Sequence, residues 1–388
     1  MTTVPSPAPP VCPHAKKCGG CQMLNLTYPE QLAWKQRRVQ KLIGSFCPVK
    51  PILGMAEPYH YRAKVQAAFG LDRNRRIISG VYQSSTRRIV PVDACAIEDE
   101  TADRILVTVR RLLPSFKIRV WDERSGTGWL RHVLVRRSFT TGQVLVALVA
   151  VSPIFPAQRA FTAKLLALHP EITTLVLNVN DTDIPLWLGP KEKTLFGPGF
   201  IEDELCGCVF RVSARSFYQV NPSQTEVLYN AAMDMAGLTG AETVLDAYCG
   251  VGTIGLIASR RAGRVLGVEQ NRDAVRDAIA NARRNGVKNA WFTAADAGAF
   301  MTELAASSER VDVVFMDPPR AGSDPRFLRS LQKLAPRHVV YISCNPDTLA
   351  RDLKVLTDGG YRAELAQPVD MFPHSTHVES VVLMSRDG

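Results

Sequence analysis

A glycine-rich stretch, Thr243–Leu256, constrains the fold of this chain more than any other feature. It reads TVLDAYCGVGTIGL, so a short apolar run ends at Asp246 and three closely spaced glycines follow. A strand that stops at such glycines lets backbone N–H groups approach a ligand at the start of the next helix. The Gly-x-Gly-x-x-Gly spacing is a weak signal by itself, so the segments around it decide its meaning.

Later strand ends support a ligand site at these glycines. Arg264–Glu269 is an apolar run that ends in an acid 19 residues after Gly250, where a ribose-binding carboxylate is expected. Two further apolar runs lead into Asp317-Pro-Pro-Arg and Cys344-Asn-Pro. Ligands of open parallel sheets bind beyond the carboxyl ends of the strands, so these loops should share one crevice. A dehydrogenase or another Rossmann-type binder is the alternative, but a prolyl pair and a cysteine suit neither hydride transfer nor phosphate binding.

The order of the expected elements predicts an α/β architecture with two lobes. Strands near residues 244, 265, 290, 311 and 339 alternate with helices, which predicts a doubly wound Rossmann-like sheet. Two late β segments, 361–369 and 378–384, should add an antiparallel edge hairpin. The preceding α+β stretch has antiparallel strands and should form a separate lobe. We expect a disordered tail at residues 1–11, an α+β lobe at 12–218 and the doubly wound domain at 219–388.

Positive charge is concentrated in the first part of the chain. The net charge is +10, and residues 1–218 hold 29 Lys and Arg against 17 Asp and Glu, whereas residues 219–388 hold 18 against 20. This asymmetry indicates a polyanionic partner held by its phosphates. No apolar run approaches the length of a membrane span and the N-terminus lacks a secretion signal, so we expect a cytoplasmic protein with no membrane partner.

Four of the nine cysteines have the spacing of a metal or cluster site. Cys12, Cys18 and Cys21 form C-x5-C-G-G-C, in which two glycines allow a tight turn, and Cys95 is a candidate fourth ligand. Four thiolates suit either zinc or an iron–sulfur cluster, and ligand softness does not separate the two. Unligated thiols are the third alternative.

The combination of DAYCGVGTIGL, DPPR and SCNP resembles the S-adenosylmethionine-dependent RNA uridine-C5 methyltransferases. Ser216–Asn221 (SFYQVN) is similar to another motif of that family, and the resemblance extends from the N-terminal cysteines to Glu379. It implies a class I methyltransferase domain, S-adenosylmethionine as methyl donor, and a [4Fe–4S] cluster on the four cysteines. It also implies a cofactor site made of Gln219, Tyr248, Gly250, Gly252, Glu269, Asp296 and Asp317. For Asp296 the alternative is a helix N-cap.

The same resemblance implies covalent catalysis by Cys344 and Glu379. Carbon 5 of uracil is a poor nucleophile, and addition of a thiolate at carbon 6 turns it into an enolate that can attack a methyl group. Cys344 follows a strand and precedes a helix, where the helix dipole is expected to lower the thiol pKa. Glu379, in His377-Val-Glu, resembles the base that removes the carbon 5 proton. Packing of Cys344 as an ordinary buried residue is the alternative.

The resemblance favours 23S ribosomal RNA as the substrate, because cluster-bearing relatives mainly modify it, and transfer RNA is the alternative. Methylation of an amino group is a rival activity, in which Cys344 would be dispensable. A non-catalytic iron–sulfur protein that binds RNA is a further rival. In either enzymatic case the target base must leave its stack to reach the crevice. We expect a monomer.

Overall fold

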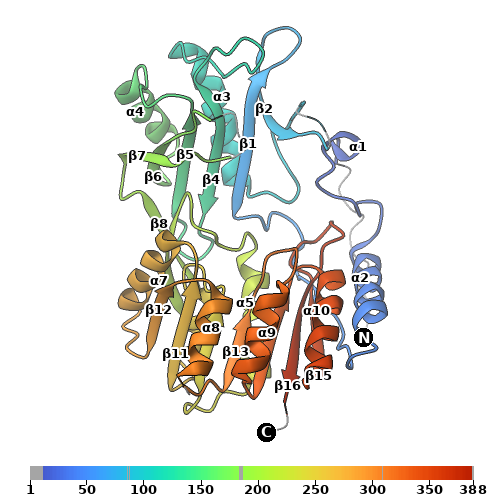
Figure 1. Ribbon diagram of the computed structural model, residues 1–388. Helices are drawn as coiled ribbons and strands as arrows, with labels where there is room; N and C mark the ends of the chain where they lie inside the picture. Colours follow the sequence, from blue (N-terminus) through green and yellow to red (C-terminus); the bar gives the residue numbers. More distant parts are fainter. Residues whose placement is uncertain (1–11, 85, 87, 183–186, 308, 387–388) are drawn as a thin grey trace.

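The protein consists of two lobes, an upper one and a lower one in the view of Figure 1. The structure is a computed structural model, and it describes residues 12–84, 86, 88–182, 187–307 and 309–386. The tail expected at residues 1–11 lies outside the described residues. In the part of the chain that is described, no helix is long and apolar enough to cross a membrane.

The lower lobe is built on a seven-stranded sheet with the order β12-β11-β10-β13-β14-β16-β15. Its strands are β10 (Thr243–Ala247), β11 (Arg264–Glu269), β12 (Ala290–Ala294), β13 (Val313–Met316), β14 (His338–Ser343), β15 (Arg362–Val369) and β16 (Glu379–Ser385). β10 to β14 are parallel, whereas β16 is antiparallel to both β14 and β15. Every residue of β13 is buried, as expected for a central parallel strand covered on both faces. The predicted doubly wound sheet with an antiparallel edge hairpin is confirmed.

Helices cover both faces of this sheet and form one apolar core on each face (Figure 1). One core contains α5 (Pro222–Ala236), α6 (Thr253–Ala258) and α7 (Arg272–Arg284). The other contains α8 (Ala297–Ala306), α9 (Pro325–Leu334) and α10 (Pro346–Asp358). All of these helices except α6 begin at an Asn or Asp whose side chain accepts a hydrogen bond from a backbone N–H. α6 begins at Gly252 without such a cap, and the N–H of Gly255 in its first turn donates to the side chain of Asp246 instead.

The upper lobe is a second seven-stranded sheet, with the order β3-β2-β1-β4-β5-β6-β7. Its strands are β1 (Lys64–Leu71), β2 (Ile77–Tyr82), β3 (Ile89–Pro91), β4 (Leu130–Arg137), β5 (Val144–Ala150), β6 (Ile172–Val179) and β7 (Lys191–Phe196). Only β5 and β6 are paired in parallel, across α4 (Gln158–Leu168), and the other described pairs are antiparallel. Together with α3 (Glu100–Ser115), this sheet encloses its own apolar core, which is the antiparallel lobe expected from the sequence.

The N-terminal segment packs against the lower lobe although it is distant from it in sequence. After α1 (Ala15–Cys18), helix α2 (Tyr28–Ile43) buries Val39 and Ile43 in the same core as β14. Residues 49 and 53 then form bridges to β15, so this segment covers the edge strand of the sheet. A hairpin of β8 (Phe200–Leu205) and β9 (Cys208–Ser213) leads from the upper lobe into α5.

Candidate active site

Strand pairing in the lower sheet brings the predicted catalytic residues together. Ser343 of β14 pairs with Ser380 of β16, and these strands are antiparallel. Cys344 follows Ser343 and Glu379 precedes Ser380, so the two residues lie opposite each other where β14 ends. Met316 of β13 is in register with the last residue of β10, which places Asp317 at the same edge of the sheet. The strand ends that carry these loops therefore lie at one edge of the sheet, as predicted.

The glycine-rich loop adopts backbone conformations that only glycine takes up without strain. Gly250 and Gly252 have φ values of 54° and 85°, and Tyr248 also lies in the left-handed region with φ 73°. The Gly250 N–H donates to Oε2 of Glu269 over 3.3 Å, and Oε1 of Glu269 accepts from the backbone of Asn271. The loop and the acid that ends β11 are therefore fixed to each other, as the ribose-binding arrangement requires.

Three carboxyl groups with raised pKa values lie at this edge of the sheet. Burial raises the pKa of Asp246 and that of Asp317 to about 7 each, and burial together with Asp317 raises the pKa of Glu379 to about 8. Oδ2 of Asp246 accepts from the Gly255 N–H at 2.7 Å, but its buried Oδ1 has no hydrogen-bond partner in the described structure. A cationic ligand would stabilise the charged forms of these acids. The sulfonium of S-adenosylmethionine meets that requirement, so the residues present fit this cofactor.

Gln219 lies beside the same acids. The pKa of the buried Tyr229 phenol is raised by burial and by Asp317, and its hydroxyl interacts with the side chains of Gln219 and Thr253. Tyr229 therefore connects Gln219 to the catalytic edge of the sheet. Neither Tyr229 nor Asp246 was among the predicted site residues. The signal for Asp246 was available, since an acid that ends the first strand before the glycines is within reach of the bound ligand.

Asp296 has the helix N-cap role that the sequence left as the alternative. Its Oδ1 accepts from the Ala299 N–H at 2.9 Å, and its Oδ2 accepts from Nε2 of Gln270 at 2.8 Å. The residue is exposed beyond the end of β12. Two donors thus orient its carboxylate at the edge of the sheet. A contact between Asp296 and the adenine of the cofactor would come in addition to this N-cap role.

The expected lowering of the Cys344 pKa by the helix dipole is wrong. Burial, Glu379 and Asp317 raise the pKa of this thiol to about 11, and nearby Arg320 lowers it less. Cys344 also lies one residue before the N-cap of α10, Asn345, and the side chain of Asn345 accepts the capping hydrogen bond from the N–H of Asp347. The surroundings of Cys344 therefore favour its thiol form, and a cationic ligand beside it would favour the thiolate.

A buried ion pair supports the loop that carries Glu379. Nζ of Lys35, on α2, donates to Oδ1 of Asp370 at 2.5 Å and to the carbonyl of Phe372, and both charged side chains are fully buried. The Tyr28 hydroxyl donates to the other oxygen of Asp370 at 3.0 Å. This network holds residues 370–377, which lead directly into Glu379, against the N-terminal helix.

We expect Lys35→Met to destabilise the protein strongly. The change leaves Asp370 charged and buried without its partner, which costs about 3–5 kcal/mol. Thermal denaturation should show a lower Tm for Lys35→Met than for the wild-type protein. Lys41 is an exposed lysine on the same helix, and Lys41→Met should leave the Tm unchanged. Equal melting of the two variants would show that the ion pair does not hold the loop.

The structure places the N-terminal cysteines near one another, but their thiols are not arranged as the ligands of a metal ion. Burial raises the pKa of Cys21 to about 11, and Cys18 and Cys12 contribute to the increase. Burial raises the pKa of Cys95 to about 12, and Glu98 contributes to the pKa shifts of Cys18, Cys21 and Cys95 alike. All four thiols are free. In the described residues no group of three or more His, Cys, Asp or Glu is arranged to hold a metal ion.

Comparison with known proteins identifies the family. The model of the family described as tRNA (Uracil-5-)-methyltransferase matches residues 27–387. The chain belongs to this family. An uncharacterised RNA methyltransferase of Halalkalibacterium halodurans is 43% identical over 378 residues, which are 96% of this chain and 82% of that protein. A second, from Clostridium acetobutylicum, is 40% identical over 384 residues, covering 97% and 83%.

A solved structure supports the same assignment. The Pyrococcus abyssi tRNA (uracil-54, C5)-methyltransferase in complex with S-adenosyl-L-homocysteine has a TM-score of 0.79 and 27% identity, and covers 99% of this chain and 88% of its own. This chain is accordingly an S-adenosylmethionine-dependent RNA methyltransferase with the class I fold.

Proposed function

We propose that this protein transfers a methyl group to carbon 5 of a uridine in 23S ribosomal RNA through a covalent bond between Cys344 and carbon 6. The observation that carries the proposal is the position of Cys344 opposite Glu379 at the end of two paired strands, beside Asp317. Methylation of an exocyclic amino group needs no nucleophilic thiol, so a partly buried cysteine opposite a buried acid favours carbon 5 as the target.

The proposed reaction assigns one step to each of the two residues. S-adenosylmethionine supplies the methyl group. The Cys344 thiolate adds to carbon 6, and the resulting enolate takes the methyl group at carbon 5, which leaves S-adenosylhomocysteine as the second product. Glu379 then accepts the proton of carbon 5, the bond between sulfur and carbon 6 breaks, and the electron pair returns to Cys344 as a thiolate. The product is 5-methyluridine, and the enzyme is regenerated once Glu379 releases its proton.

We assign the cofactor to the loops at the carboxyl ends of β10, β11 and β13. The glycines at 250 and 252 permit close approach of the backbone, and Glu269 is placed for the ribose hydroxyls. Asp317 and Gln219 face the reacting groups. The remaining assigned contacts are those of Tyr248 and Asp296. A dry, acidic site of this kind favours the positively charged donor over its neutral product.

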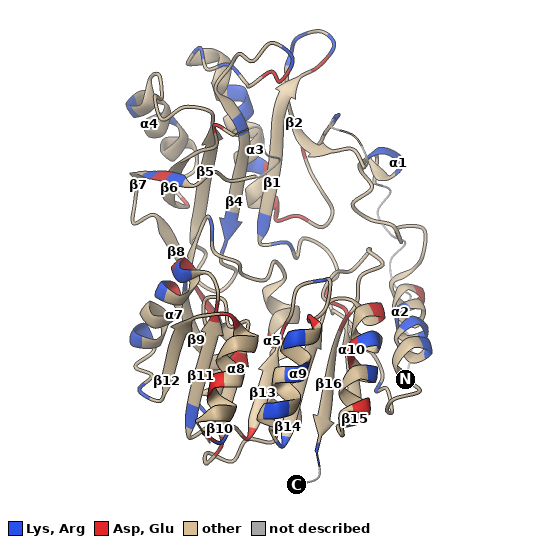
Figure 2. Cartoon of the chain, in the orientation of Figure 1, with Lys and Arg blue, Asp and Glu red and all other residues tan. Residues whose placement is uncertain are grey.

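The domain assignment follows from the charge of the two parts. We assign residues 12–218 to RNA binding and residues 219–388 to methyl transfer, although α2 packs with the catalytic lobe. Lys and Arg occur over much of the upper lobe, and they include the ends of β1 and β4 that face the lower lobe (Figure 2). We place this activity in the cytoplasm, with the RNA substrates, and propose that the protein acts as a monomer.

Transfer RNA is the second candidate substrate, because the structural neighbour from Pyrococcus abyssi is a tRNA (uracil-54, C5)-methyltransferase. Mapping of 5-methyluridine in RNA from cells with and without the gene separates the two. Loss of a site in 23S ribosomal RNA is the expected result. Loss of a site in transfer RNA alone would show that the substrate is transfer RNA. An unchanged set of 5-methyluridine sites would contradict the proposed function.

We also propose that Cys12, Cys18, Cys21 and Cys95 hold a [4Fe–4S] cluster. The chemistry of these residues fits an iron–sulfur cluster, since all four are free, partly buried thiols. Gly19, with φ 71°, permits the turn between Cys18 and Cys21. The cluster would link α1 to the segment before α3 and so fix the N-terminal residues to the upper lobe. The C-x5-CGGC pattern is shared with cluster-bearing relatives, and it is the feature that favours ribosomal RNA as the substrate.

Protein purified without oxygen should therefore be brown and contain about four irons per chain. Cys95→Ser should lose the iron, because it removes one of the four ligands. Cys47→Ser is the matched control and should keep it, since Cys47 is buried among apolar residues in the lower lobe. One zinc per chain without iron would disprove the cluster.

A further inference from the structure

Two basic side chains, Lys64 and Arg136, lie opposite each other in the upper sheet without an acidic partner. They are directly paired residues of the antiparallel strands β1 and β4, so their side chains are on the same face. Like charges in this position destabilise a sheet. Burial, Arg136 and Arg62 lower the pKa of Lys64 to about 8, and no described residue forms an ion pair or hydrogen bond with its ammonium group.

Arg136 is more deeply buried than Lys64 and is only partly satisfied. Its side chain is 3% exposed, its Nη2 donates to the carbonyl of Ser216, and its Nε has no hydrogen-bond partner within the described residues. Burial lowers the pKa of this guanidinium to about 10. A buried charge with an unused donor is costly unless a ligand supplies the missing acceptor.

The other charged residues of the surrounding crevice do not neutralise these two. The crevice is narrow and lies between the lobes, where Lys64 and Arg136 line it together with Gln219. Arg137 also lines it but is paired with Asp99 at 2.7 Å. The remaining acid, Asp203, accepts hydrogen bonds from two hydroxyl groups, and burial raises its pKa above the ordinary range. The crevice thus has an excess of positive charge.

The position of the crevice identifies the anion. Gln219 lines it, and the neighbouring Tyr229 interacts with Asp317 at the edge of the lower sheet. Arg136 donates to the carbonyl of Ser216 at the start of the Ser216–Asn221 loop. We propose that Lys64 and Arg136 bind a backbone phosphate of the RNA next to the target uridine. This inference rests on the proposed function, because a uridine in the catalytic crevice brings its own phosphates to the boundary between the lobes. Such a contact would fix the flipped nucleotide independently of its base.

The proposal is tested by the salt dependence of RNA binding, measured without cofactor on the RNA that the wild-type protein methylates. Lys64→Met should weaken binding about ten-fold at moderate salt. The slope of log Kd against log salt should become shallower by about 0.7–0.9, the value of one lost phosphate contact. The Tm should stay the same or rise, because the variant removes an unpaired, partly buried charge. A purely structural lysine would instead lower the Tm and leave the salt slope unchanged.

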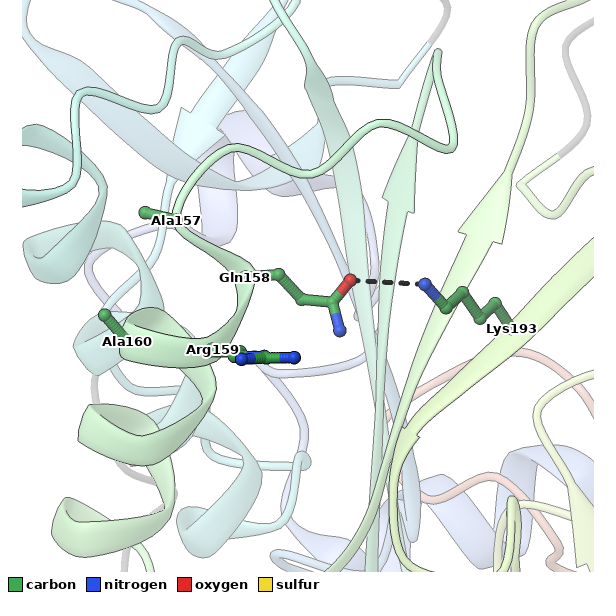
Figure 3. A pocket seen from close by; sticks show the side chains of 5 residues that line it. All are labelled: Ala157, Gln158, Arg159, Ala160 and Lys193. Atoms are coloured by element: carbon green, nitrogen blue, oxygen red, sulfur yellow. Dashed lines mark hydrogen bonds between the residues drawn. The ribbon is translucent and has the colours of Figure 1, made fainter.

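The matched control is Lys193→Met in the same lobe. Lys193 is exposed beside a surface hollow of about 530 Å³ between α4 and β7, where its Nζ donates to Oε1 of Gln158 at 3.4 Å (Figure 3). This hollow holds no acid or nucleophile, and we expect wild-type RNA affinity and salt slope from the variant. Equal losses in Lys193→Met and Lys64→Met would show diffuse attraction by the basic lobe and overturn the phosphate site.

Three further outcomes separate this site from its alternatives. If Lys64→Met loses affinity for S-adenosylmethionine but keeps the wild-type salt slope for RNA, the anion is the cofactor carboxylate and the proposal is wrong. A wild-type protein that methylates no RNA would overturn the proposed function, and this site with it. A protein that methylates RNA while Lys64→Met binds as wild type would overturn the phosphate site alone.

Discussion

Replacing Glu379 with glutamine should leave the protein covalently attached to methylated RNA. The variant keeps the Cys344 nucleophile and the cofactor loops, so addition to carbon 6 and methyl transfer proceed. It lacks the base that removes the carbon 5 proton, and without that step the bond between sulfur and carbon 6 cannot break. Turnover should fall by about 10²–10⁴-fold. Denaturing gel electrophoresis with labelled RNA should show a retarded band.

The control for this prediction is Glu303→Gln, the same change at an exposed position of α8, which should turn over as wild type without a retarded band. Wild-type protein given RNA with 5-fluorouridine at the target should form the band too, since fluorine does not leave as a proton does. Normal turnover by Glu379→Gln would place the base elsewhere. Asp317, whose pKa is also raised by burial, would then be the next candidate.

Replacing Cys344 with alanine should abolish methylation rather than slow a late step. Without the thiolate no bond to carbon 6 forms, and carbon 5 keeps the low nucleophilicity of free uracil. We expect a loss of at least about 10⁴-fold in turnover, comparable with other deletions of an enzymatic nucleophile. No retarded band should appear, even with 5-fluorouridine RNA. The assay is transfer of labelled methyl groups to RNA.

Cys206→Ala is the matched control for that variant. Cys206 lies in the turn between β8 and β9, outside the site, and its replacement should leave methyl transfer unchanged. Retained methylation of carbon 5 by Cys344→Ala would contradict the covalent mechanism. Binding of S-adenosylmethionine should be unaffected in both variants, which shows whether a loss of activity reflects misfolding.

Local sequence patterns were sufficient to predict the lower sheet. Each parallel strand is a short apolar run followed by a polar or glycine-rich loop, and this pattern can be recognised without tertiary information. The late hairpin was likewise expected from two local β segments. The convergence of Cys344 and Asp317 was expected because the carboxyl ends of neighbouring parallel strands meet at one edge. Glu379 begins an antiparallel strand, and only the resemblance to the family implied its place there.

Features that depend on residues distant in sequence were not predictable in this way. The Lys35–Asp370 pair joins residues from the two ends of the chain, and nothing near Lys35 indicates its partner. The opposed cations Lys64 and Arg136 became visible only from the register of β1 and β4. For Cys344, the helix dipole was judged from the neighbouring sequence, whereas burial and two acids from other strands determine its pKa.

The measurement that tests the central claim most directly is nucleoside analysis of RNA treated with the purified protein and S-adenosylmethionine carrying a labelled methyl group. The account predicts that the label appears in 5-methyluridine with the wild-type protein and in no nucleoside with Cys344→Ala. Label in a methylated cytidine, adenosine or guanosine, or equal amounts of 5-methyluridine from both proteins, would contradict it.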